Sequence, residues 1–200
     1  MMFRVTRIAA LASVLVALTG PAFAHTGHGN AGGFVHGFMH PVGGLDHMLV
    51  MMAVGLYAVR LGGRALWLMP ATFIAVMAFG GLLGTFRIAD PFFEIGVAMS
   101  VVVLGLAVAL RANMTTITAV ALVGLVAIFH GYAHGAEMPG DVSGYAYAAG
   151  FMLATALLHS AGIALGLLAD RLSKLGGRRM VEASGGAMAL AGVVILIRMA

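Results

Sequence analysis

Residues 91–110 read PFFEIGVAMSVVVLGLAVAL, a stretch in which Glu94 is the one charged side chain. A bilayer core of about 30 Å is crossed by a helix of about 20 apolar residues, so this stretch predicts a transmembrane helix. Cutting the chain at its charges and Gly/Pro pairs gives five more stretches of similar length. The short connections predict one all-α, polytopic membrane bundle with antiparallel neighbours and no soluble domain. The six expected spans are approximately 38–60, 64–86, 91–110, 114–136, 143–169 and 180–198.

The composition supports the same fold class. The chain is 62% hydrophobic and 9% charged, with a mean hydropathy of +1.04, whereas a soluble domain carries about 25% charged residues. The 11 basic residues are scattered in short loops, which indicates a topology signal rather than a nucleic-acid-binding face. Because the chain has no cysteine, a disulfide scaffold and every thiolate metal site are excluded.

The N-terminus is typical of a secretory signal. Arg4 and Arg7 precede an apolar run from Ile8 to Leu18, and an A-x-A cleavage pattern ends at Ala24. The apolar run is too short to span a bilayer. We therefore expect three segments, which are a cleaved signal peptide (1–24), a histidine-bearing periplasmic arm (25–37) and a six-helix transmembrane domain (38–198).

Lysine and arginine are unevenly distributed between the two sides of the expected bundle. Seven fall on one side, and Arg87 and Arg198 fall on the other. The richer side is expected to be cytoplasmic, which puts both mature termini and the loop holding Glu137 and Asp141 outside. The seven are Arg60, Arg64, Arg111, Arg171, Lys174, Arg178 and Arg179.

Small residues recur at four-residue spacing in several spans. Such pairs let helix backbones approach closely in lipid, so they indicate a closely packed bundle. The pairs are Gly80 and Gly84, Gly131 and Gly135, and Gly162 and Gly166.

Ionisable side chains inside the spans are the candidate functional residues, because they are costly in a membrane and usually have a role there. They gather in two stretches, VHGFMHPVGGLDH at 35–47 and FHGYAHGAE at 129–137. The candidate metal ligands in these stretches are His36, His40, Asp46, His47, His130, His134 and Glu137. Glu94 early in the third span and His159 in the fifth complete the set inside the spans.

The second stretch has the clearest geometry. At about 100° per residue, His134 lies about 40° from His130, and Glu137 lies about 20° from His130 on the other side. Two imidazoles and a carboxylate on one helix face form half of a metal site. The alternative is that the histidines hydrogen-bond to neighbouring helices while Glu137 lies at the water interface.

The first stretch leaves more than one arrangement open. In a continuous helix His40 and His47 share a face, whereas Asp46 points about 120° away. Pro41 disfavours helical geometry at His40, and Gly43-Gly44 loosens the next turn. A local distortion would bring Asp46 into the site as a ligand. Otherwise Asp46 orients a ligating histidine or caps the helix.

The expected topology relates these residues by depth. The first span enters from outside and the fourth exits there, so both stretches lie in the outer half of the membrane. His159, about 16 residues into its span, is expected roughly 25 Å further in, as a ligand or an interhelical hydrogen-bond partner. His25 and His28 at the new terminus form either a capture arm for a divalent ion or a flexible tail without function.

These motifs resemble the HupE/UreJ family of nickel and cobalt permeases. The first stretch is similar to the family signature at His40-Pro41, Gly44 and Asp46-His47, and the second at Phe129-His130-Gly131, Gly135 and Glu137. The resemblance covers essentially the whole mature chain. It implies uptake of Ni²⁺ or Co²⁺ for enzymes such as hydrogenase or urease, with site residues at His40, Asp46, His47, His130 and Glu137. His134 is supported by helix geometry rather than by the family pattern.

We therefore expect a metal permease of the bacterial inner membrane rather than an enzyme, with Ni²⁺ or Co²⁺ as the transported substrate and no permanent cofactor. Lipid and the metal ion are the expected partners, and nucleic acid is not. Imidazole and carboxylate also bind zinc and copper(II), so nickel rests on the resemblance. The competing classes are an intramembrane metalloenzyme with fixed zinc or iron and an accessory protein that assists hydrogenase or urease maturation proteins. A homo-oligomer is compatible with each class.

Overall fold

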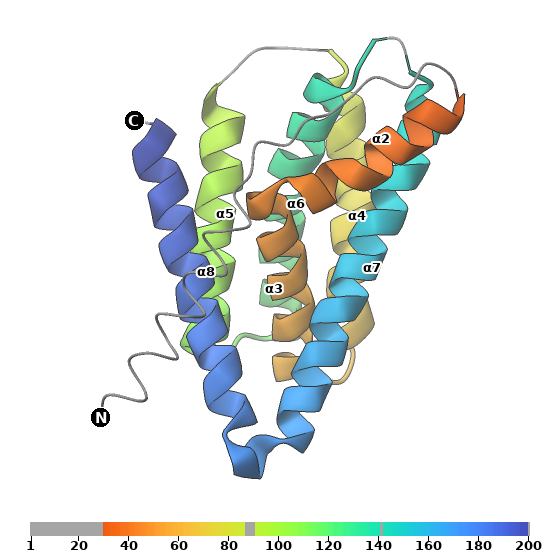
Figure 1. The fold of residues 1–200 in the computed structure, drawn as a ribbon. Helices are drawn as coiled ribbons and strands as arrows, with labels where there is room; N and C mark the ends of the chain where they lie inside the picture. The colour runs from red at the N-terminus through yellow and green to blue at the C-terminus, as the bar shows by residue number, and fades with distance from the viewer. Residues whose placement is uncertain (1–29, 87–90, 141, 200) are drawn as a thin grey trace.

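The computed structural model describes residues 30–86, 91–140 and 142–199. Within these ranges the chain is all-helical and contains no β-strand. The helices are α2 (Asn30–Gly43), α3 (Leu45–Leu61), α4 (Ala65–Gly84), α5 (Pro91–Ala109), α6 (Thr116–Glu137), α7 (Gly144–Arg171) and α8 (Gly177–Met199), with a 3-10 turn, η1 (Ser173–Leu175), before α8. Figure 1 shows them as one bundle in which α2 lies across one end.

The predicted membrane fold is confirmed. Helices α4 to α8 are each long and apolar enough to cross a bilayer, and α2 with α3 adds a sixth span if the bent pair is counted as one. The proposed signal peptide, 1–24, lies outside the described residues. The expected boundary between arm and bundle at residue 37 falls inside α2, because the chain is already helical from Asn30.

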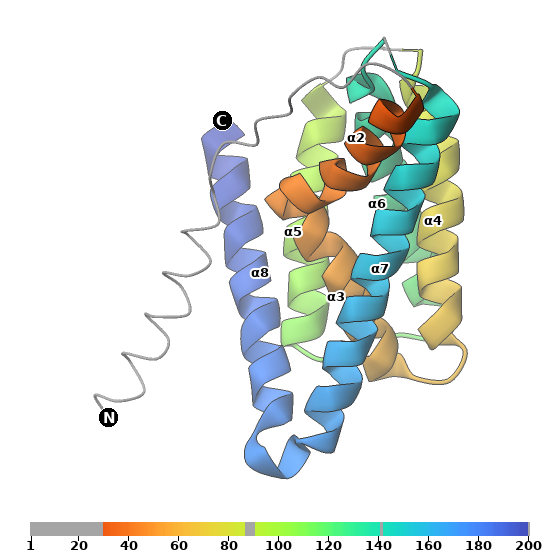
Figure 2. The ribbon, with the colours of Figure 1, turned by 45° about the vertical axis from the view of Figure 1, so that its right-hand side comes forward.

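The first span is broken rather than continuous. Helices α2 and α3 meet at Gly44 with a bend of 78°, and Gly44 itself has an extended backbone (φ −89°, ψ 113°). The prediction that Pro41 disfavours helical geometry at His40 is wrong, since both residues lie inside α2. The helix continues past Pro41 because α2 packs along α7, as both views of the ribbon show (Figures 1 and 2).

Close helix contacts are made where the sequence has its spaced glycines. The most extensive contacts join α4 to α6 and α5 to α8. A Cβ atom added at any of the six glycines of the predicted pairs would lie 3.0 Å or less from an atom of a neighbouring helix. Gly135, for example, faces the backbone carbonyl of Gly81. The prediction that these residues permit close backbone approach is confirmed.

The two ends of the bundle differ in charge. The α3–α4, α5–α6 and α7–α8 connections all lie at the end opposite α2 (Figure 1). The seven basic residues of the sequence analysis are in or beside these connections, so the fold gathers them at one end. The candidate ligands of α2 and α6 lie toward the other end.

Candidate metal centre

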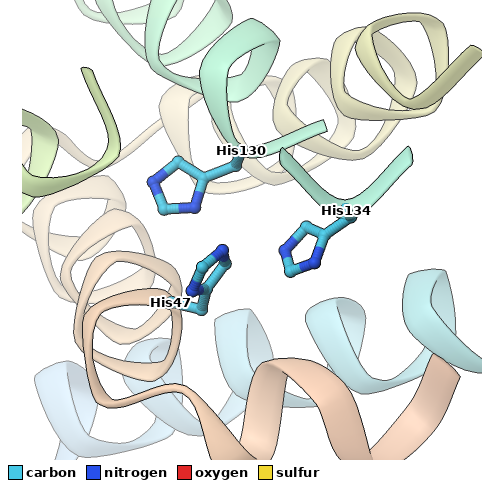
Figure 3. Close-up of side chains that lie close together, drawn as sticks. All are labelled: His47, His130 and His134. Carbon is cyan, nitrogen blue, oxygen red and sulfur yellow. The ribbon is translucent and has the colours of Figure 1, made fainter. Parts of the chain in front are cut away.

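Three buried histidines meet between α3 and α6, and Figure 3 shows their rings facing a common space. His47 comes from the first turn of α3, and His130 and His134 are one turn apart near the end of α6. Their relative exposures are 7%, 0% and 2%. One ring nitrogen from each lies within 4.8 Å of the others, so small side-chain movements would bring all three to the metal–nitrogen distance of about 2.0–2.1 Å around one ion. We call these residues the inner trio.

The break at Gly44 positions His47. Because α3 starts immediately after Gly44, His47 lies in its first turn and is directed toward α6. A Cβ atom at residue 44 would lie 2.9 Å from His47 Nδ1 and 3.1 Å from Asp46 Oδ1. A side chain at this position would therefore displace both groups. Glycine at this position therefore leaves room for the observed placement of both groups.

Asp46 holds the His47 ring. Its Oδ1 atom lies 2.7 Å from His47 Nδ1 and also accepts a hydrogen bond from the backbone N–H of His47 at 2.9 Å. An ionised carboxylate can only accept a hydrogen bond, so Nδ1 carries the proton of His47 and Nε2 has the free lone pair. His47 Nε2 is buried with no hydrogen-bond partner. The geometry therefore favours Asp46 as the residue that orients a ligand, one of the arrangements left open by the sequence.

Ser100 holds the His130 ring, and sequence reasoning missed it. Its hydroxyl donates to the carbonyl of Val97 at 2.5 Å and lies 2.8 Å from His130 Nε2. A hydroxyl has one proton to donate, so Ser100 must accept from an Nε2–H group. The lone pair of His130 is thereby assigned to Nδ1, which is buried and unpartnered. The one signal in the sequence is that Ser100 is the sole hydroxyl in the 91–110 stretch.

A second group of candidate ligands lies beside the inner trio. It consists of His40 from α2 with His134 and Glu137 from α6, and its three ligand atoms are also within 4.8 Å of one another. His40 Nε2 is 3.0 Å from Glu137 Oε2, and these side chains are 29% and 52% exposed. His134 belongs to both groups. The structure thus brings together the two histidine-bearing stretches that the sequence singled out.

The remaining candidates are not part of either group among the described residues. His36 is half-buried on α2, and Glu94 is exposed in the first turn of α5. His25 and His28 lie outside the described residues, so their role stays a prediction.

His159 on α7 is buried one aromatic ring away from the inner trio. The ring of Phe73 has its centroid 5.7 Å from that of His130 and 5.0 Å from that of His159. The prediction that His159 lies roughly 25 Å further into the membrane than the other ligands is therefore wrong. His130 is itself seven residues, or about 10 Å, inside the end of α6, which shortens the distance. Neither ring nitrogen of His159 has a hydrogen-bond partner.

A cavity of about 410 Å³ between α4, α6 and α7 reaches His134. Its lining is largely apolar and includes Met77, Leu82 and Phe151. Such a wall gives no ligands to a hydrated ion, which costs free energy to strip of its water. On its other side His134 has the polar neighbours His40 and Glu137.

Comparison with known proteins identifies the family. The family described as HupE / UreJ protein matches residues 13–195. Protein HupE of Rhizobium leguminosarum bv. viciae is 44% identical over 188 residues, which cover 94% of this chain and 97% of that relative. No solved structure matches the chain. The two sequence matches show that this membrane protein belongs to the HupE/UreJ family, which confirms the resemblance carried by its two histidine-bearing motifs.

Proposed function

We propose that this protein imports a divalent transition metal, Ni²⁺ by preference and Co²⁺ as the alternative, across the bacterial inner membrane. The observation that carries the proposal is the inner trio. Its three imidazoles are buried, their ligand nitrogens converge within 4.8 Å, and those of His47 and His130 are held toward the space by Asp46 and Ser100. Buried polar atoms without partners are rare in folded proteins, and a metal ion would satisfy them.

The charges around the trio suit a dehydrated cation. Moving a doubly charged ion out of water is costly unless ligands and opposite charges replace the solvent. Asp46 stands directly behind His47, and Glu137 lies at the exposed edge beside His40. These carboxylates offset part of the charge of the ion, while the imidazoles replace its water ligands.

Nickel is chosen on family grounds rather than on ligand chemistry. Nitrogen and oxygen ligands bind nickel, cobalt, zinc and copper(II), with affinity that rises toward copper. The resemblance to nickel and cobalt permeases therefore supports the identity of the cargo. Supply of nickel to a hydrogenase or urease is the corresponding role in the cell.

The charge asymmetry of the bundle supports import from the periplasm. The end that gathers the basic connections is proposed to face the cytoplasm by the positive-inside rule. The inner trio and the exposed Glu137 then lie in the periplasmic half. His159, beyond Phe73, is the next ligand-bearing side chain toward the cytoplasm.

The rival function is an intramembrane metalloenzyme, which the three-histidine ligand set would also serve, since catalytic zinc is often held by three protein ligands. The two functions differ in whether the ion leaves. Purified protein in sealed vesicles should show Ni²⁺ flux that is lost in His130→Ala. Tight binding of nickel without any flux would instead support the enzyme.

The test in cells uses a strain that lacks its other nickel importers. His47→Ala and His130→Ala should each abolish nickel accumulation, because a buried site that has lost a ligand cannot offset dehydration of the ion. Met51→Leu, a volume-conserving change at a fully buried packing residue of α3, should leave accumulation nearly intact. Normal accumulation in both histidine variants would refute the proposed site.

A further inference from the structure

His134 is common to both groups of ligands, and the geometry points to a path built around it. We propose that the protein has two metal subsites that share His134. The outer subsite, His40, His134 and Glu137, captures the ion, and the inner trio then receives it while His134 stays coordinated. This inference rests on the proposed function and deepens it, since it assigns separate tasks to ligands of one polar cluster.

Exposure separates the two subsites. The side chains of His40 and Glu137 are 29% and 52% exposed, whereas that of His47 is 9% exposed and His130 and His134 are buried. The outer subsite is therefore wet and contains the carboxylate, which attracts a hydrated cation and raises its local concentration. The inner trio is buried and consists of imidazoles alone, and the nearest carboxylate, Asp46, lies 2.7 Å from His47 Nδ1.

The ring positions favour two subsites over one site with five ligands. The centroid of His134 lies 4.6 Å from that of His40 and 4.2 Å from that of His47. His40 and His47 are 6.2 Å apart, so His134 lies nearer to each than they lie to one another. Both ring nitrogens of His134 are buried without a hydrogen-bond partner, in contrast to His47 and His130, whose second nitrogens are held.

Ligand chemistry makes occupation of the subsites mutually exclusive. A neutral imidazole has one lone pair to offer a metal, so His134 can bind an ion in one subsite at a time. Capture replaces the contact between His40 Nε2 and Glu137 Oε2 with bonds from both atoms to the ion, and the proton of the neutral His40 ring then lies on Nδ1. In the transfer step, bonds to His40 and Glu137 break as bonds to His47 and His130 form. The ion never loses all its protein ligands during this exchange.

The experiment compares equilibrium and rate for Ni²⁺ binding to the purified full-length protein. Wild type should bind one Ni²⁺ per chain. His130→Ala should lower the equilibrium affinity by more than about 100-fold, since loss of a ligand exceeds the 10- to 100-fold effect of losing an outer partner. Glu137→Gln should change the equilibrium affinity by less than about threefold, yet slow association by at least about tenfold.

The matched control is Glu182→Gln, which removes another partly exposed carboxylate, one that pairs with Arg111 at the opposite end of the bundle. It should alter neither affinity nor association rate. Thermal unfolding of each variant shows whether a loss of binding reflects a loss of fold. If His130→Ala unfolds, His130→Gln provides the second inner variant.

Two results would overturn the shared path while leaving metal import intact. One is equal loss of equilibrium affinity in Glu137→Gln and His130→Ala, which would mean a single joint site. The other is binding of two Ni²⁺ ions by one chain, which would mean that His134 is not shared. Absence of Ni²⁺ binding by the wild type would overturn the proposed function itself, and with it both subsites.

Discussion

Ser100 provides a sharp test of the inner trio, because it touches one ligand and contributes none itself. Its hydroxyl lies 2.8 Å from His130 Nε2 and donates to the carbonyl of Val97, which favours the His130 tautomer with its proton on Nε2. In Ser100→Ala the His130 ring would lose the hydroxyl that holds its orientation toward the inner trio. Loss of a partner that orients a metal ligand costs about 10- to 100-fold in metal affinity. We therefore expect Ni²⁺ affinity to fall by about 10- to 100-fold.

The matched control for Ser100→Ala is Ser184→Ala on α8. Ser184 also donates its hydroxyl to the carbonyl three residues earlier, Val181, at 2.8 Å. The control therefore removes the same intrahelical hydrogen bond without touching an imidazole. Ser100→Thr retains a hydroxyl and should retain more affinity than Ser100→Ala.

The assay is calorimetric titration of Ni²⁺ into purified protein, with the unfolding temperature measured on the same samples. We expect Ser100→Ala to lose Ni²⁺ affinity while it remains folded at the assay temperature, as Ser184→Ala does. Unchanged affinity in Ser100→Ala would refute the assignment of Nδ1 as the ligand atom of His130. An equal loss in Ser184→Ala would show that the hydroxyl acts through the helix rather than through the imidazole.

Three further predictions follow from the fold and the site. Gly44→Ala should lower Ni²⁺ affinity at least about tenfold, because the new Cβ atom would lie 2.9 Å from His47 Nδ1; wild-type affinity in a folded variant would contradict this. Reporter fusions after Arg60 and after Lys174 should read as cytoplasmic and one after Gly140 as periplasmic, and the reverse pattern would overturn the orientation. Uptake by vesicles should decline as the outside pH is lowered, because protonated histidine cannot bind a metal; constant uptake down to about pH 5 would argue against histidine capture.

Hydropathy was sufficient to predict the fold, because a span must be long and apolar whatever its neighbours are. The alignment of His130, His134 and Glu137 was equally accessible, since helical periodicity alone puts them on one face. The structure keeps all three within one uninterrupted helix, α6. Predictions of this kind depend on local geometry, and local geometry is what a single sequence specifies best.

Contacts between segments far apart in the sequence could not be predicted from local geometry. The hydrogen bond of Ser100 to His130 joins residues 30 positions apart, and a lone serine in an apolar helix usually bonds to its own backbone. The predicted distance between His159 and the other ligands was too long, because it was counted along α7 alone. His130 lies well inside α6, so the two rings are close to the same Phe73 ring. The sequence allowed a local distortion near Gly44. It did not give the angle of the bend or its place after Pro41, because these depend on the packing of α2 along α7.

The bend at Gly44 brings the two histidines of the first span, His40 and His47, close to the same neighbouring ring. In a continuous helix His40 and His47 would be separated by about 10 Å along the axis, too far for both to approach the single ring of His134. The 78° turn instead lays α2 across the end of the bundle, and the two rings come within 6.2 Å of each other. His134 can then be approached from the exposed side by His40 and from the buried side by His47. One broken helix thus supplies a ligand to each side of the imidazole that the ion must pass.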